Sequence, residues 1–94
     1  MFTYKAMYKY LDEGIHAEVL DFPGVITWAD NLAEARRLLA SALTDMAETN
    51  LLLGESLPQP DATVTDVEAD LEEPIYLLLN ATNRVIQVPQ ESNA

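Results

Sequence analysis

The sequence contains no cysteine, a single histidine and only isolated glycines. The absence of cysteine excludes disulfides, thiolate nucleophiles and zinc sites built on thiolates. His16 has no second histidine to work with as a base or metal ligand, and its place on the polar face of a predicted strand favours an ordinary surface role. Gly14, Gly24 and Gly54 stand apart from one another, so the sequence has no glycine-rich phosphate loop.

Long hydrophobic runs are missing as well, and we expect no secretory leader. No apolar run approaches the roughly 20 residues that a membrane span requires. Residues 1–9 alternate polar and apolar side chains and lack the apolar core of a signal peptide. We therefore expect no membrane association and a cytoplasmic location.

The polar residues do not form a recognisable catalytic pattern. Asp21 and Asp30 flank a predicted short strand, where a carboxylate pair could hold a metal, but a turn accounts for Asp21 and a helix start for Asp30. Ser41 and Ser56 lack any context that would activate a nucleophile. We expect a protein that is not an enzyme and that has no cofactor and no bound metal.

Basic residues are scarce. Five Lys and Arg stand against 16 Asp and Glu, which gives a formal charge of −11, and no basic residue lies between Arg37 and Arg84. Such a surface repels phosphate backbones, so direct nucleic-acid binding is disfavoured. A basic protein partner would be attracted and its encounter accelerated. Solubility alone is the alternative explanation of the charge.

The length suits one domain. A chain of 94 residues has no room for a second core, and 49% hydrophobic residues with 22% charged residues indicate a folded rather than a disordered protein. A chain of this size buries only roughly two-thirds of its unfolded surface. Oligomerisation would add stability to so small a core.

A hairpin of two strands is predicted at the N-terminus. Polar and apolar side chains alternate over residues 2–19 on both sides of a D-E-G turn signal, with Tyr8 and the other aromatics on one face and Met7 on the other. A two-residue loop would pair Tyr10 with Ile15. A three-residue loop with a glycine bulge would change the register, and both remain open.

A short strand at residues 25–28 and a helix at about residues 31–53 follow. Asn31 and Glu34 match a capping box, and Gly54 suits the position after the last helical turn. The residues predicted to form the buried stripe of this helix are Leu32, Ala35, Leu39, Ala42, Leu43 and Met46.

The segments predicted after the helix are an extended exit at 57–60, an acidic loop at 61–73, a C-terminal strand region at 74–89 with strands at 75–79 and 85–88, and a frayed tail at 90–94. The predicted fold is α+β in the order β-β-β-α-β. A three-stranded antiparallel sheet packs on one long helix, with one or two C-terminal strands. Residues 1–94 form one domain, with its core in residues 2–60.

Two motifs together resemble a known family. The sequence D-F-P-G-V-I-T at residues 21–27, followed by Asp30, Leu32, Glu34 and Ala35, resembles the PG-x-x-T-x-G-D-(T)-L-x-E-A core of HicB-like proteins. One helix later, G-E-S-L-P-Q-P at residues 54–60 resembles the G-x-x-L-P-x-P exit of that family. The match covers about residues 2–60 in the right order. The departures from the family pattern are Leu20, Ala29 and Asn31.

The resemblance implies a degenerate RNase H-like fold without nuclease residues and the role of an antitoxin. The implied partner is a small basic HicA-type ribonuclease toxin, whose active site the antitoxin covers. Many HicB proteins carry a C-terminal DNA-binding domain. After Pro60 this sequence has an acidic loop and apolar strands without a basic recognition element, which disfavours direct DNA contact and favours pairing into a homo-oligomer, a dimer or tetramer.

Candidate contacts with a protein partner combine aromatic anchors with acidic residues. They are Trp28, Tyr8, Glu18, Asp66, Glu68, Asp70 and Glu72. Two alternatives remain. One is a stand-alone homo-oligomeric HicB-like protein without a toxin, and the other is remnant RNase H-type metal chemistry at Asp21, Asp30 or Glu34.

Overall fold

The computed structural model describes residues 1–79 and 85–86 of the chain. Its elements are β1 (Phe2–Leu11), β2 (Gly14–Val19), β3 (Ile26–Ala29), α1 (Leu32–Leu52), β4 (Leu71–Leu79) and β5 (Val85–Ile86). The predicted α+β order is therefore confirmed. The end of the last predicted strand, 87–88, and the predicted frayed tail, 90–94, lie outside the described residues.

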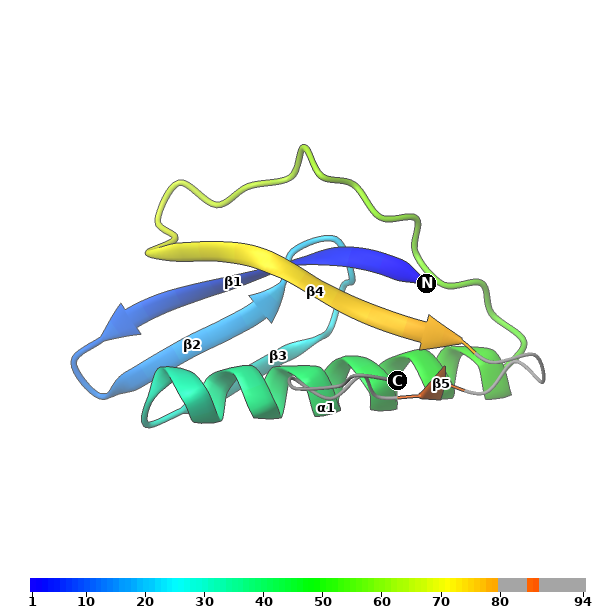
Figure 1. Ribbon diagram of the computed structural model, residues 1–94, viewed down its shortest axis with the longest axis horizontal. Helices are drawn as coiled ribbons and strands as arrows, with labels where there is room; N and C mark the ends of the chain where they lie inside the picture. The colour runs from blue at the N-terminus through cyan, green and yellow to red at the C-terminus, as the bar shows by residue number, and fades with distance from the viewer. Residues whose placement is uncertain (80–84, 87–94) are drawn as a thin grey trace.

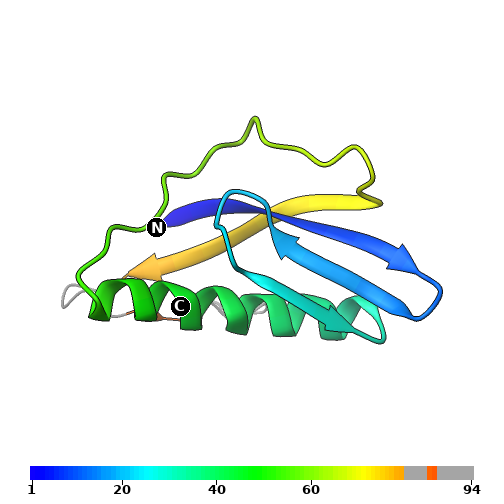
Figure 2. The same cartoon turned by 180° about the vertical axis from the view of Figure 1, so that it is seen from behind.

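One antiparallel sheet organises these elements, with strand order β3-β2-β1-β4-β5. Helix α1 lies along one face of the sheet, and the segment from α1 to β4 crosses on the opposite side (Figure 1). Seen from behind, β3 forms the edge nearest the viewer (Figure 2). We call the face away from α1 the outer face, and residues 55–70 the outer loop.

The β1–β2 hairpin has a two-residue loop, which decides between the two loop lengths that the sequence allowed. Tyr10 is paired with Ile15 and Tyr8 with Ala17. Directly paired residues project to the same face, so this register fixes which side chains point toward α1. The strand residues buried on that side are Tyr4, Ala6, Tyr8, Ala17, Val19, Ala29 and Leu77.

Gly14 at the end of this loop is required by its surroundings. Its φ is +148°, and a Cβ built there would lie 2.7 Å from the carbonyl oxygen of Ala29 and 2.9 Å from the ring of Trp28. A side chain would therefore meet both the backbone and the aromatic ring of β3. The close approach of the hairpin to β3 depends on glycine at this position.

Both ends of α1 use the predicted capping residues. The Oδ1 atom of Asn31 accepts the N–H of Glu34 at 2.9 Å. The Glu34 side chain pairs with Arg37, so only half of the expected capping box forms. Gly54 follows the helix with φ +76°, and its N–H donates to the carbonyl of Leu51 at 3.1 Å.

The buried stripe of α1 agrees with its predicted spacing. Ala35, Leu39 and Leu43 are buried as predicted, and Ala47, one turn further on, was missed. The predicted Ala42 and Met46 pack at the margin of the core. Aromatic rings pack in the same core as this stripe. The ring of Tyr4 contacts that of Phe22 edge-on, at a centroid distance of 5.3 Å.

Strand β4 corrects the prediction for the C-terminal half. It begins at Leu71, inside the stretch 61–73 predicted as a loop, and runs through Pro74, which was predicted to precede the strand. Pro74 faces Lys5 of β1. The N–H of Lys5 donates to Asp21 and its carbonyl accepts from the turn after β2, so both point away from β4. This pair has no direct backbone hydrogen bonds, and β1 does not need the N–H that proline lacks.

The outer loop forms a third layer over β1 (Figure 1). Met7 was predicted to lie on the face of β1 opposite the aromatics, beside the lysines, and it is fully buried there. The reason is the outer loop, which is bonded to the side chains of Lys5 and Lys9 on either side of Met7. The described part of the chain has no helix long and apolar enough to cross a membrane.

Candidate functional site

The structure divides the predicted partner contacts into buried, internally bonded and exposed groups. Tyr8 is a correction, since it is only 1% exposed. Its pairing with Ala17 directs it toward α1, and burial, followed by the nearby charge of Glu73, raises the pKa of its phenol. A side chain in this position cannot contact a partner of the folded chain. The remaining predicted contacts lie on the outer face or in the segment that covers it.

The acidic residues of the outer loop and early β4 are bonded within the chain. The Nζ atom of Lys9 lies 3.0 Å from Asp66 and 3.5 Å from Glu68. The Nζ atom of Lys5 lies 3.5 Å from Glu72 and also donates to two loop carbonyls. These acids hold the loop on β1, so they are less available to a partner than their sequence pattern indicates.

The pKa values of two of these carboxyls report the same bonding. The backbone N–H of Glu68 and then the ammonium of Lys9 hold the pKa of Asp66 below its ordinary value. The hydroxyl of Thr65, followed by the backbone N–H of Asp66, lowers the pKa of Glu72. Both carboxylates are therefore stabilised in their charged forms by contacts that exist only when the loop is in place.

Two further carboxylates anchor the ends of the outer loop to the sheet. The buried Asp21 accepts the N–H of Lys5 at one oxygen and the N–H of Asp61 at the other, both at 2.9 Å. At the far end, Asp70 accepts the N–H of Tyr10 at 2.7 Å. Asp21 thus has a structural role that joins β1 to a segment 40 residues later.

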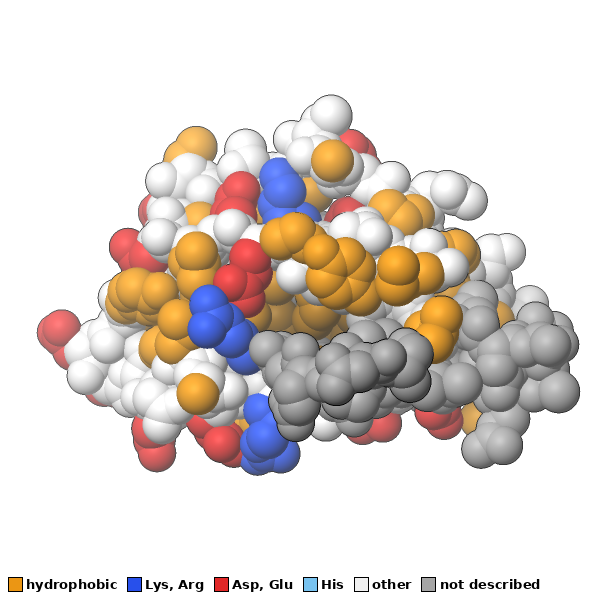
Figure 3. Space-filling model, in the orientation of Figure 1, with side chains coloured by type: hydrophobic (Ala, Val, Ile, Leu, Met, Phe, Trp, Pro, Cys, Tyr) orange, Lys and Arg blue, Asp and Glu red, His pale blue; other side chains and the backbone are white. Residues whose placement is uncertain are grey.

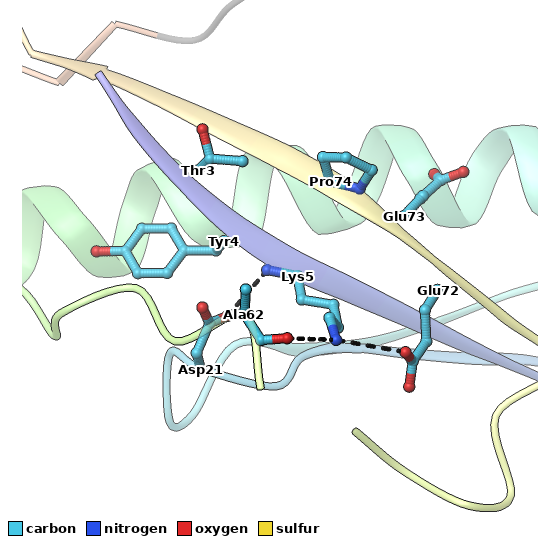
Figure 4. Close-up of a pocket in the computed structure, with 8 residues that line it drawn as sticks. All are labelled: Thr3, Tyr4, Lys5, Asp21, Ala62, Glu72, Glu73 and Pro74. Carbon is cyan, nitrogen blue, oxygen red and sulfur yellow. Dashed lines mark hydrogen bonds and ion pairs between the residues drawn. The ribbon is translucent and has the colours of Figure 1, made fainter. Parts of the chain in front are cut away.

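A cavity of about 290 Å³ opens where the outer loop meets β1 and β4 (Figure 4). It is lined by Thr3, Tyr4, Lys5, Asp21, Ala62, Glu72, Glu73 and Pro74. Asp21 is satisfied by two backbone N–H groups, Lys5 is paired with Glu72, and Glu73 forms a bidentate pair with Arg36 at 2.9 Å. Each charged group of the cavity is therefore bonded to another group of the chain rather than directed at a ligand.

The carboxylates considered for metal chemistry do not converge. Asp21 precedes β3 and Asp30 follows it, at opposite ends of that strand, and Glu34 is paired with Arg37. Within residues 1–79 and 85–86, no three His, Asp or Glu side chains gather as a metal site would require. The geometry of the described residues therefore gives the metal alternative no support.

Trp28 and Ile26 form an exposed apolar pair on the outer face of β3. Trp28 is 44% exposed and Ile26 is 55% exposed. On the neighbouring strand they face His16 and Glu18, whose side chains lie 3.0 Å apart. Trp28 also covers Gly14. The outer loop protects Met7 of β1 but does not bury this pair.

Uncompensated negative charge lies at the same end of the sheet. Each Lys and Arg of the described residues is paired with an acid of the chain, in the pairs Lys5–Glu72, Lys9–Asp66, Arg36–Glu73 and Arg37–Glu34. Asp12, Glu13 and Asp30 have neither a side-chain hydrogen bond nor an ion pair within residues 1–79 and 85–86. They occupy the β1–β2 loop and the end of β3, which the pairing of Ile15 with Ala29 brings together.

The sequence prediction included Trp28 and Glu18 but missed Ile26. The signal for Ile26 is the two-residue period of residues 25–29, in which Val25 and Ala29 are buried and Ile26 and Trp28 are exposed. A second exposed apolar group was also missed. Hydrophobic side chains form a band across the face that carries β4 (Figure 3). On this strand Tyr76 is 48% exposed.

Comparisons with known proteins agree with the fold. No family model and no curated protein matches the sequence. Among solved structures, the chain is similar to the N-terminal domain of the Burkholderia pseudomallei antitoxin HicB, with a TM-score of 0.65 and 21% sequence identity. The match covers 83% of this chain and 100% of that chain. The HicB-like fold predicted from the two sequence motifs is therefore confirmed.

Proposed function

We propose that this chain is a HicB-type antitoxin that binds a small basic HicA-type mRNA-cleaving toxin and neutralises it by covering its active site. The observation that carries the proposal is the similarity of fold to a HicB antitoxin domain over the whole length of that domain. Inhibition of this kind needs only contact. The chain then acts without turnover, cofactor or metal.

Charge supports the same function. The described lysines and arginines are all paired internally, so the surface that remains for a partner is predominantly acidic. A ribonuclease binds RNA through a positively charged surface, because it must contact phosphates. An acidic protein competes with RNA for that surface and is steered to it over long range. Binding should therefore weaken as the salt concentration rises.

The remaining properties follow from this function. We propose that the chain does not bind nucleic acid directly, since its formal charge of −11 repels phosphates. We also propose that it assembles as a dimer or tetramer in the cytoplasm, where toxin and mRNA meet. Assembly would compensate for a core built from one helix and a small sheet.

The test is a purification of the tagged full chain from the cells that make it, first at low and then at moderate salt. We expect a small basic protein to copurify at low salt and to be released as salt rises. The separated partner should cleave RNA, and adding the chain back should stop cleavage at a fixed molar ratio. A partner with no ribonuclease activity, or activity unaffected by the chain, would contradict the proposal.

A stand-alone homo-oligomer is the second candidate function. The exposed Tyr76 and Leu78 on β4 favour it, because apolar side chains on a strand suit contact between copies. In that case the same purification would recover only the chain itself, as a stable symmetric oligomer. Light scattering combined with size exclusion would give its stoichiometry, and Tyr76→Lys should dissociate it.

A further inference from the structure

The two edges of the sheet differ in their capacity to accept another strand. At the β4 edge, β5 pairs with Leu78 and Leu79, and Pro74 has no N–H to offer in the middle of the strand. At the β3 edge, no described segment pairs with the outer side of the strand (Figure 2). The described β3 strand also contains no proline. An added strand therefore fits β3 and not β4.

The hydrogen-bond alternation of β3 determines which groups it offers. The N–H of Val19 donates to the carbonyl of Val25 at 2.9 Å, so Val25 faces β2. In an antiparallel ladder the direction of the backbone groups alternates along the strand. Thr27 therefore faces β2 as well, and the N–H and carbonyl groups of Ile26 and Trp28 point outward from the sheet. The same two residues carry the exposed apolar side chains.

Charge around this edge selects the sign of its partner. Asp12, Glu13 and Asp30 lie at the end of β3 next to Trp28 and have no counter-charge among the described residues. A second copy would bring another set of these acids to the interface, and like charges placed together are unfavourable. A segment rich in lysine or arginine would compensate them.

We propose that the outer edge of β3 is the docking site for an extended basic segment of a protein partner. The segment forms backbone hydrogen bonds with Ile26 and Trp28, covers their side chains, and places its cations near Asp12, Glu13 and Asp30. This is strand addition, in which the backbone provides affinity and the flanking side chains provide selectivity. The toxin as the source of the segment rests on the proposed function, whereas the site itself does not.

The chain supplies its own probe for this site, because Trp28 is the single tryptophan of the sequence. The test titrates the full chain with a short peptide that alternates arginine and valine, and follows the fluorescence of Trp28. We expect a saturable change, together with shifts of the backbone amide signals of residues 26–28. The same peptide with glutamate in place of arginine should not bind.

Two lysine variants locate the binding. Ile26→Lys places a cation on the β3 edge and should weaken peptide binding about tenfold, because like charges would then face each other. Leu52→Lys adds the same charge at an exposed side chain at the C-terminal end of α1 and should leave binding unchanged. Circular dichroism checks that both variants are folded. If Ile26→Lys unfolds the chain, the combined Asp12→Asn, Glu13→Gln and Asp30→Asn variant replaces it and should also weaken binding.

Several results would overturn the site. They are absence of peptide binding, amide shifts at β4 instead of β3, or equal affinity of the Ile26→Lys and unaltered chains. Self-association that Ile26→Lys abolishes would make a second copy the occupant. A copurified toxin that Ile26→Lys still inhibits fully would leave the antitoxin function standing and exclude the toxin as the source of the segment. Peptide binding at β3 without any toxin partner would leave the site standing and contradict the antitoxin function.

Discussion

Replacing Asp21 by asparagine tests how the outer loop is held on the sheet. Both carboxylate oxygens of Asp21 accept a backbone N–H at 2.9 Å, one from Lys5 and one from Asp61, and the residue is 8% exposed. Asparagine has one acceptor oxygen, and its amide group would turn a donor toward the second N–H. One partly buried N–H group therefore loses its partner in the Asp21→Asn variant.

A buried donor left without a partner costs about 1–3 kcal/mol. We expect the free energy of unfolding to fall by about 2 kcal/mol. The total for a chain of this length is roughly 5–14 kcal/mol, so the loss is a large fraction of it. The melting temperature should fall by on the order of 10 °C.

Urea unfolding at neutral pH, followed by circular dichroism, measures the effect. Asp45→Asn is the matched control, since Asp45 is exposed on α1 and its side chain has no partner among the described residues. It should change the free energy of unfolding by less than about 0.5 kcal/mol. Hydrogen exchange of the Asp61 N–H should accelerate in Asp21→Asn alone. Equal stability of the two variants would refute the anchoring role of Asp21.

Three further predictions concern the hairpin, the core and the outer loop. Gly14→Ala should lower the free energy of unfolding by about 2 kcal/mol or more, because the new Cβ would contact Ala29 and Trp28 and the backbone would be strained. Gly54→Ala, with open space around its Cα, should lower it by only about 1 kcal/mol, and equal losses would contradict the role of the close contact at Gly14. Leu39→Asp should abolish cooperative melting by burying an unpaired charge, while Leu52→Asp, at a side chain that is 87% exposed, should melt near the parent temperature. Cooperative melting of Leu39→Asp near the parent temperature would contradict the placement of Leu39 in the core. The lowered pKa values of Asp66 and Glu72 mean that the folded state binds fewer protons than the unfolded state, so their contribution is complete above about pH 4.5 and is lost as pH falls through the lowered values. Peroxide should then oxidise the exposed Met1 at neutral and acidic pH but the buried Met7 only in acid, and equal protection of Met7 at both pH values would contradict this loss.

Local features of the fold were predictable from the sequence. The caps at Asn31 and Gly54 depend on residues within one helical turn, and the D-E-G signal lies in the hairpin loop itself. The helix stripe around Leu39 follows from spacing alone. Such features need no knowledge of distant segments, which explains why they were read correctly.

The features that were missed depend on contacts between distant segments. Met7 is buried because a loop some 60 residues later, anchored to Lys5, crosses above it. Pro74 can lie within β4 because it is paired with Lys5, whose backbone groups point away from β4, so the missing N–H of proline is not needed. The loop acids, predicted as partner contacts, are largely committed to two lysines. The sequence shows charge at these positions but not which charges neutralise each other.

For the candidate site, the sequence indicated Trp28 and a basic partner. It did not indicate that the backbone groups of β3 are open, because that depends on strand order and on the alternation set by Val19. It also suggested Tyr8, since aromatic residues of a strand look alike until the register assigns their faces. The open edge and its acidic end emerge only from the folded chain.

The most direct test of the account is RNA cleavage by the basic protein that copurifies with this chain. We predict that adding the purified chain suppresses cleavage in proportion to its amount, with complete inhibition at a fixed molar ratio, and that raised salt restores cleavage. Recovery of the chain alone, or cleavage that continues in excess chain, would contradict its function as an antitoxin.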